Sequence, residues 1–84
     1  MIKTSKNTLG YLVRGVINGW KEGKSNKPVL FQIGQATQEQ KQAYLLGWRI
    51  GLSDYNHPLL NHACQQGMDA VHKYLESELI VEIK

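Results

Sequence analysis

Residues 9–23 read LGYLVRGVINGWKEG, and this segment says most about how the chain folds. Its apolar residues recur every three or four positions, which predicts an amphipathic helix over residues 8–23. Gly15, Gly19 and Gly23 follow one flank of the apolar stripe. Each of them weakens a helix by about 1 kcal/mol relative to alanine. We therefore expect these glycines to let another backbone, or a flat aromatic ring, come close to the helix.

A second helix is predicted over residues 38–54. Thr37 and Gln40 have the spacing of a capping box at its start. A second pair of glycines, Gly47 and Gly51, repeats the spacing of the first helix. The segment is apolar on most faces, and its narrow polar stripe consists of Gln38, Gln42, Arg49 and Ser53. Because a short helix of this kind is typical of a buried position, we expect it to lie at the centre of the fold.

A third helix is predicted from Pro58 to about residue 77, since proline favours the first position of a helix. Two short apolar runs, residues 29–33 and 79–83, are expected to pair as a two-stranded ribbon. The predicted fold class is therefore mainly α, a small three-helix domain with this ribbon. Residues 1–84 form a single domain in this interpretation, and residues 1–7 are expected to be a flexible N-terminus.

Length and composition exclude several classes of protein. The chain has 84 residues and one cysteine, Cys64, so it cannot form an internal disulfide. Its apolar runs are much shorter than the roughly 20 residues of a membrane span, and its first residues do not resemble a signal peptide. We therefore expect a cytoplasmic protein that makes no membrane contact. A chain of this length also has no room for a large enzyme architecture.

The formal charge of +3 is distributed unevenly. Residues 1–41 carry seven basic and two acidic side chains, a net charge of +5. Residues 42–84 carry three basic and five acidic side chains, a net charge of −2. A basic N-terminal half favours an anionic partner, and nucleic acid is the most common one. The basic residues expected to contact it, mostly at phosphates, are Arg14, Lys21, Lys24, Lys27, Lys41 and Arg49. Tyr11 is the candidate for stacking on a base.

The sequence predicts neither a metal site nor a catalytic site. The spacing of His57, His62, Cys64 and His72 matches no zinc-binding pattern. His62 and Cys64 are two residues apart, so on a helix they point in different directions and cannot form a catalytic pair. We therefore expect no enzymatic activity, no cofactor and no metal.

The glycines and basic residues together resemble a known family. The residues that carry the resemblance are Arg14, Gly15, Gly19, Gly23, Lys24, Ser25 and Pro28, followed by Gln40, Gln42, Tyr44, Leu45, Gly47, Trp48 and Arg49. In this pattern, residues 11–51 are similar to the ribosome modulation factor family. The resemblance implies a small non-enzymatic regulator of translation that binds the ribosome through ribosomal RNA. Many relatives of this type are small prophage or plasmid proteins.

A second class of function is also compatible with the sequence. The surplus of glycines in the helices and the edge of a C-terminal strand fit a protein-interaction module. Such a module would bind a host protein, as accessory factors of prophages and plasmids do, or a second copy of itself.

Overall fold

The structure, a computed structural model, describes residues 2–4, 6–29, 34–78 and 81–83. These residues form a small all-α domain with four helices, accompanied by two strands of three residues each. In chain order the elements are β1 (Ile2–Thr4), α1 (Lys6–Ser25), α2 (Gln38–Ser53), α3 (Pro58–Gln66), α4 (Met68–Ser77) and β2 (Val81–Ile83). The radius of gyration is 11.7 Å, as expected for a compact chain of this length.

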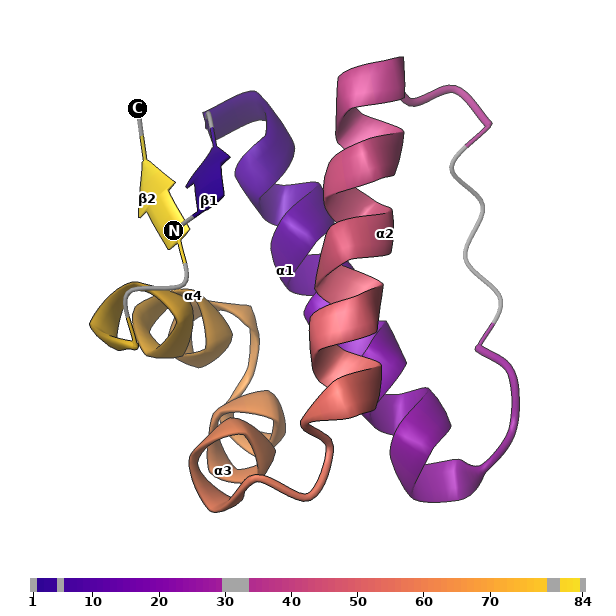
Figure 1. The fold of residues 1–84 in the computed structure, drawn as a ribbon, viewed down its shortest axis with the longest axis vertical. Helices are drawn as coiled ribbons and strands as arrows, with labels where there is room; N and C mark the ends of the chain where they lie inside the picture. The colour runs from indigo at the N-terminus through magenta and orange to yellow at the C-terminus, as the bar shows by residue number, and fades with distance from the viewer. Residues whose placement is uncertain (1, 5, 30–33, 79–80, 84) are drawn as a thin grey trace.

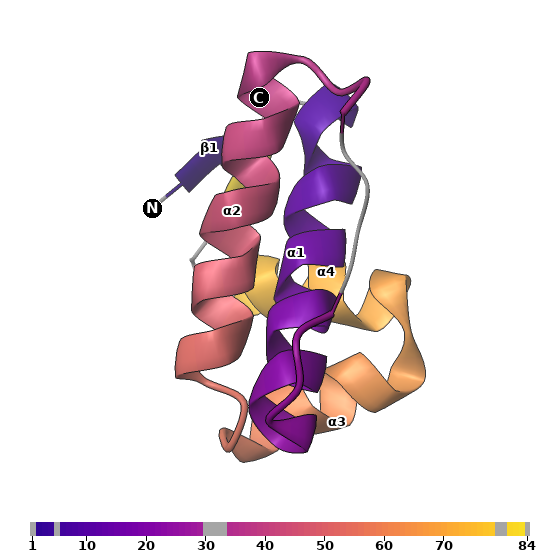
Figure 2. The same ribbon diagram turned by 90° about the vertical axis from the view of Figure 1, so that its right-hand side faces the viewer.

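Helices α1 and α2 lie side by side and run in the same direction (Figures 1 and 2). Leu12 and Val16 face Gly47, whereas Val16 and Trp20 face Gly51, so the two helices progress together along their length. Both helices begin at the same end of the molecule. Parallel neighbours need a long connection, and here residues 26–37 join the end of α1 to the start of α2.

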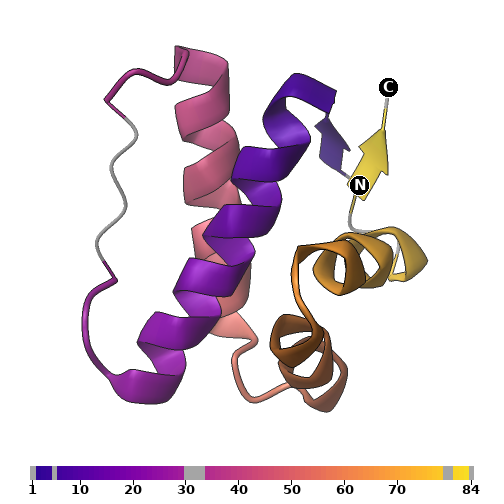
Figure 3. The same cartoon turned by 180° about the vertical axis from the view of Figure 1, so that it is seen from behind.

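Helix α1, rather than α2, is the centre of the fold. Figure 3 shows α1 between α2 on one side and α3 and α4 on the other. The buried apolar core comes from α1, α3 and α4, and its members are Leu12, Val13, Val16, Ile17, Leu60, Ala63, Cys64, Val71 and Leu75. The buried residues of α2 are only Tyr44, Gly47 and Gly51. The prediction of a central second helix is therefore wrong. Its glycines face α1, and this orientation directs Leu45 to the opposite, solvent-exposed side.

The predicted third helix is two helices, because the chain breaks at Gly67. Its backbone has φ 119° and ψ −174°, a conformation that is essentially restricted to glycine. Gly67 ends α3 and precedes α4, so the two helices pack against each other and against α1. His57 caps α3, because its Nδ1 accepts a hydrogen bond of 3.2 Å from the main-chain nitrogen of Leu59. Pro58 is the first helical residue, as predicted.

The strands pair differently from the prediction. Val81–Ile83 lies parallel to Ile2–Thr4, with Ile2 opposite Val81 and Thr4 opposite Ile83 (Figure 1). Of the expected partner segment, Val29 has no regular structure, and residues 30–33 lie outside the described residues. Because α4 packs beside the first turns of α1, the two ends of the chain are brought to the same place. Ile2–Thr4 therefore belongs to the ribbon, in the segment expected to be a flexible N-terminus.

Candidate nucleic-acid surface

One side of α1 carries the basic residues Arg14, Lys21 and Lys24, and we call it the outward side of α1. Lys21 and Lys24 are exposed on the last two turns of the helix, and Lys27 is exposed in the turn that follows. Asn26 has a left-handed backbone with φ 57°, and its N–H donates to the carbonyl oxygen of Glu22 at 2.8 Å. This is a common way of ending a helix. Lys27 follows this turn directly, so the three exposed lysines lie within the last turns of α1 and the turn after it.

Glu22 is the only acidic residue of α1, and its carboxylate is bound by α2. Its Oε2 accepts a hydrogen bond of 2.6 Å from the indole nitrogen of Trp48 in α2. One turn earlier, the side-chain nitrogen of Asn18 donates to the hydroxyl of Tyr44 at 3.0 Å. Both hydrogen bonds tie α1 to α2. One carboxylate oxygen of Glu22 is therefore engaged by α2, and the exposed charged side chains of α1 are Lys6, Lys21 and Lys24.

Arg14 lies two turns before Lys21 on a similar side of α1, since seven residues turn a helix by almost two full rotations. Its guanidinium reaches α4, where Nη2 contacts the sulfur of Met68 at 3.7 Å. Arg14 is only partly buried by this contact. It therefore extends the basic surface toward the start of α1, at a distance of about 10 Å along the helix from Lys21.

The structure does not bring Lys41 and Arg49 to the same place. Lys41 is partly buried near the start of α2, whereas Lys21 and Lys24 lie near the end of α1. Because the helices are parallel, these are opposite ends of the pair. Arg49 is exposed on the side of α2 that faces away from the glycines, and hence away from α1. Tyr11 is partly buried near the start of α1, about 15 Å along the helix from Lys21.

Tyr55 is available for stacking on a base, although the sequence favours Tyr11, and the structure places Tyr55 in one pocket with Lys27. Its ring lies against Gly23, where an added Cβ atom would be 2.5 Å from Cδ1 of the ring. Together they border a pocket of about 480 Å³ between the ends of α1 and α2, lined also by Glu22, Asn26, Lys27, Pro28 and Leu52. The constant sequence separation between glycines that face each other across α1 and α2 predicts the contact between Gly23 and Tyr55. Gly15 and Gly47, and then Gly19 and Gly51, are 32 residues apart, and so are Gly23 and Tyr55.

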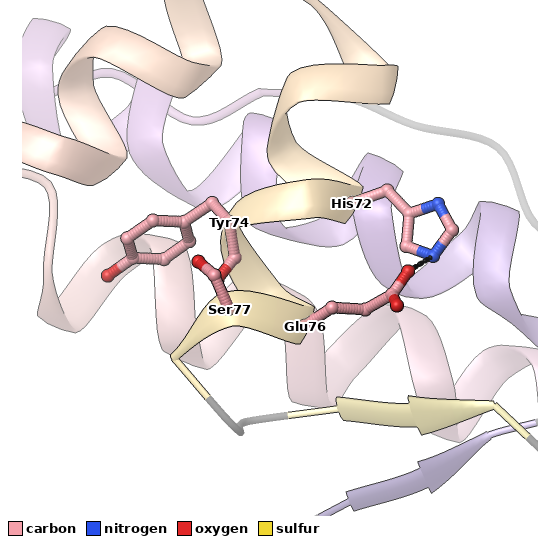
Figure 4. A network of polar contacts seen from close by, with 4 residues as sticks. All are labelled: His72, Tyr74, Glu76 and Ser77. Atoms are coloured by element: carbon pink, nitrogen blue, oxygen red, sulfur yellow. Dashed lines mark hydrogen bonds and ion pairs between the residues drawn. The ribbon is translucent and has the colours of Figure 1, made fainter.

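A smaller pocket of about 190 Å³ lies between the first turns of α1 and α4, and its lining includes Lys6, Asp69 and His72. Nε2 of His72 forms an ion pair with Oε1 of Glu76 one turn later (Figure 4). Tyr74 points to another side of α4, and the Ser77 hydroxyl donates to its carbonyl oxygen at 3.0 Å. These contacts lie within a single helix, so they account for the local order of α4 and do not define a reactive site.

The residues considered for metal binding or catalysis are dispersed. In the described part of the chain, no group of three or more His, Cys, Asp or Glu side chains could hold a metal ion. Cys64 belongs to the buried core, and burial raises the pKa of its thiol from 9.0 to about 11. Such a thiol is protonated at neutral pH, and a protonated thiol is a poor nucleophile. None of the described helices combines the length and apolar character needed to cross a membrane.

No protein-family model, curated protein or solved structure matches this chain.

Proposed function

We propose that this protein is a non-enzymatic, cytoplasmic regulator that binds nucleic acid, and ribosomal RNA above all, through the outward side of α1. The observation that carries the proposal is the hydrogen bond between Trp48 and Glu22. It engages the only carboxylate of α1 with α2, while Lys21 and Lys24 remain exposed. An exposed helix side with cations and no carboxylate suits a phosphate backbone. The resemblance of residues 11–51 to the ribosome modulation factor family favours ribosomal RNA as the partner.

The expected contacts position the protein and do not select a sequence. Lysine side chains act on phosphates as flexible point charges, and such contacts carry no base information. Binding should therefore depend strongly on salt, because each phosphate contact releases condensed counterions. Arg14 and Lys27 extend the contact along the strand on either side of Lys21 and Lys24. Lys41 and Arg49 lie apart from this surface and should contribute little.

Fluorescence anisotropy with a short RNA, measured over a series of salt concentrations, tests the proposal. The double change Lys21→Ala and Lys24→Ala should weaken binding and reduce the steepness of its salt dependence by about 0.7 to 0.9 for each phosphate that is no longer bound. The matched control is Lys6→Ala with Lys73→Ala, which removes the same charge from exposed positions elsewhere. Equal effects of the two double variants, or no salt-sensitive binding by the wild type, would contradict the proposal.

A second candidate function, protein interaction, is favoured by one observation. Leu45 is 50% exposed on the side of α2 that faces away from α1. An apolar side chain there fits contact with a host protein or with a second copy of this chain. Light scattering after size exclusion, comparing the wild type with Leu45→Glu, tests the homodimer. A wild-type monomer at all concentrations would leave only a different protein as the partner of this side.

A further inference from the structure

The pocket at the ends of α1 and α2 contains an aromatic ring and apolar side chains, which phosphate contacts do not require. Gly23 permits the Tyr55 ring to lie directly on α1, and a side chain at position 23 would displace it. Leu52 and Pro28 add apolar surface beside the ring. The floor of the pocket is therefore suited to a flat apolar group, and its volume of about 480 Å³ is in the usual range for small-ligand pockets.

The polar residues of the same pocket differ in how deeply they are buried. Glu22 is partly buried, and its carboxylate is fixed in place because Oε2 accepts the Trp48 indole hydrogen. A carboxylate offers about four lone-pair sites, so it can accept further hydrogen bonds from a ligand. Its negative charge disfavours a phosphate inside the pocket. Lys27 and Asn26 are exposed, so a cation and an amide stand nearer to solvent.

This distribution of apolar, acidic and basic groups is complementary to one nucleotide of a single-stranded nucleic acid. A nucleobase is flat, has apolar faces for stacking on Tyr55, and carries N–H groups on its edge that can donate to a carboxylate. Its phosphate would remain outside the pocket, beside Lys27 and within reach of the lysines on α1. A base in a duplex has its edge paired and its faces stacked, so it could enter only after leaving the helix.

We infer that this pocket binds one unpaired nucleobase against Tyr55, with Glu22 accepting from the edge of the base and Lys27 contacting its phosphate. The inference rests on the proposed function and makes it more specific, because it predicts a preference for single-stranded over duplex nucleic acid. Tyr55, rather than Tyr11, is then the stacking residue. Stacking of a base on an aromatic side chain tolerates any sequence, and the Glu22 contact is open to all four bases because each carries an N–H donor on its edge.

The test compares Tyr55→Leu with Tyr55→Phe, using a short unstructured RNA strand and the duplex of that strand with its complement. Tyr55→Leu should weaken single-strand binding by about 10-fold or more and leave duplex binding unchanged. Tyr55→Phe keeps the ring and should keep the affinity. Gly23→Ala should act like Tyr55→Leu, because its Cβ atom would push the ring away from α1. Circular dichroism establishes that each variant is folded.

A second measurement uses the unmodified protein. On adding the RNA strand, base protons should shift upfield in the NMR spectrum because an aromatic ring lies over them, and this shift should be absent with Tyr55→Leu. Equal binding of strand and duplex, or unchanged single-strand affinity in a folded Tyr55→Leu variant, would contradict base binding in the pocket. Neither result would contradict RNA binding by the basic residues of α1. Failure to bind either RNA would instead contradict the proposed function itself.

Discussion

Gly15 lies so close to the main chain of Tyr44 that a Cβ atom on the glycine would overlap the Tyr44 carbonyl oxygen and stand 2.8 Å from the amide nitrogen of Trp48. The contact is reciprocal, because a Cβ atom on Gly47 would overlap the carbonyl oxygen of Leu12. Gly19 and Gly51 repeat the arrangement one turn later. Contacts between Cα–H groups and carbonyl oxygens recur where helices approach this closely. The backbones of α1 and α2 therefore touch at these four glycines.

The first prediction concerns this close approach. Gly15→Ala or Gly47→Ala should lower the free energy of unfolding by about 1–3 kcal/mol, because the methyl group forces the two backbones apart. The matched control is Gly10→Ala in the same helix α1. Gly10 is exposed, and an added Cβ atom meets nothing within 4 Å, so this change should stabilise by up to about 1 kcal/mol. Urea denaturation measures all three. Stabilisation by Gly15→Ala would show that the helices are not in backbone contact.

The second prediction concerns the buried hydrogen bond between Asn18 and Tyr44, which is 3.0 Å long. Asn18 is 4% exposed, so removing the Tyr44 hydroxyl takes an acceptor from a buried amide. Tyr44→Phe should therefore lower the free energy of unfolding by about 1–3 kcal/mol. A double-mutant cycle with Asn18→Ala should show a coupling of at least about 0.5 kcal/mol. Additive effects of the two changes would argue against a direct bond.

The third prediction concerns the break between α3 and α4. Gly67→Ala should destabilise the domain by about 1–3 kcal/mol, because φ 119° with ψ −174° is strained for any residue that has a Cβ atom. The added methyl group itself meets nothing within 4 Å, so crowding plays no part. Thermal unfolding checks the size of the loss. An unchanged melting temperature would mean that α3 and α4 can join in another backbone conformation.

The fourth prediction concerns alkaline pH. Burial raises the pKa of the Cys64 thiol from 9.0 to about 11. The pKa of Tyr74 is also raised, first by burial and then by the negative charges of Glu78, Asp54 and Cys64. In the unfolded chain both groups ionise at lower pH than in the folded protein. The stabilisation that the protonated Cys64 thiol contributes is thus fully present below pH 9.0 and is lost as the pH rises toward about 11, and the raised pKa of Tyr74 acts in the same direction.

Denaturation curves at several pH values test this dependence, with Cys64→Ala as the comparison. That change leaves a small cavity, so the slope of stability against pH is the informative quantity. The slope between pH 9 and 11 should be smaller in the variant, because the Cys64 thiol no longer contributes to it. Identical slopes would assign the alkaline loss to other groups.

Local features of the fold were predictable from neighbouring residues. The capping box is confirmed, since the Thr37 hydroxyl accepts from the Gln40 amide and the Gln40 side chain accepts from the Thr37 amide. The role of the glycines in close approach is also confirmed, for a backbone at Gly15 and for an aromatic ring at Gly23. Such features depend on residue type and on neighbours within one or two turns, and the sequence shows these directly.

Features that depend on distant residues were missed. The apolar count made α2 look central, but burial depends on which face meets α1, and Gly47 and Gly51 set that face. The sequence favoured Tyr11 over Tyr55 for stacking, because the position of Tyr55 depends on its contact with Gly23, 32 residues earlier. Gly67 fell within the single helix predicted from Pro58 to about residue 77, although its backbone conformation ends α3.

The sequence by itself determined which parts of the chain form α1 and α2, that their glycines allow close contact, and that the net positive charge lies in the first half of the chain. These properties follow from side-chain periodicity, backbone propensity and composition. Only the tertiary structure decided that α1 and α2 run parallel, that Trp48 binds Glu22, and that Tyr55 and Lys27 border one pocket. The physical reason is that these relations join residues separated by more than 20 positions, and packing in three dimensions selects among the arrangements that the local pattern allows.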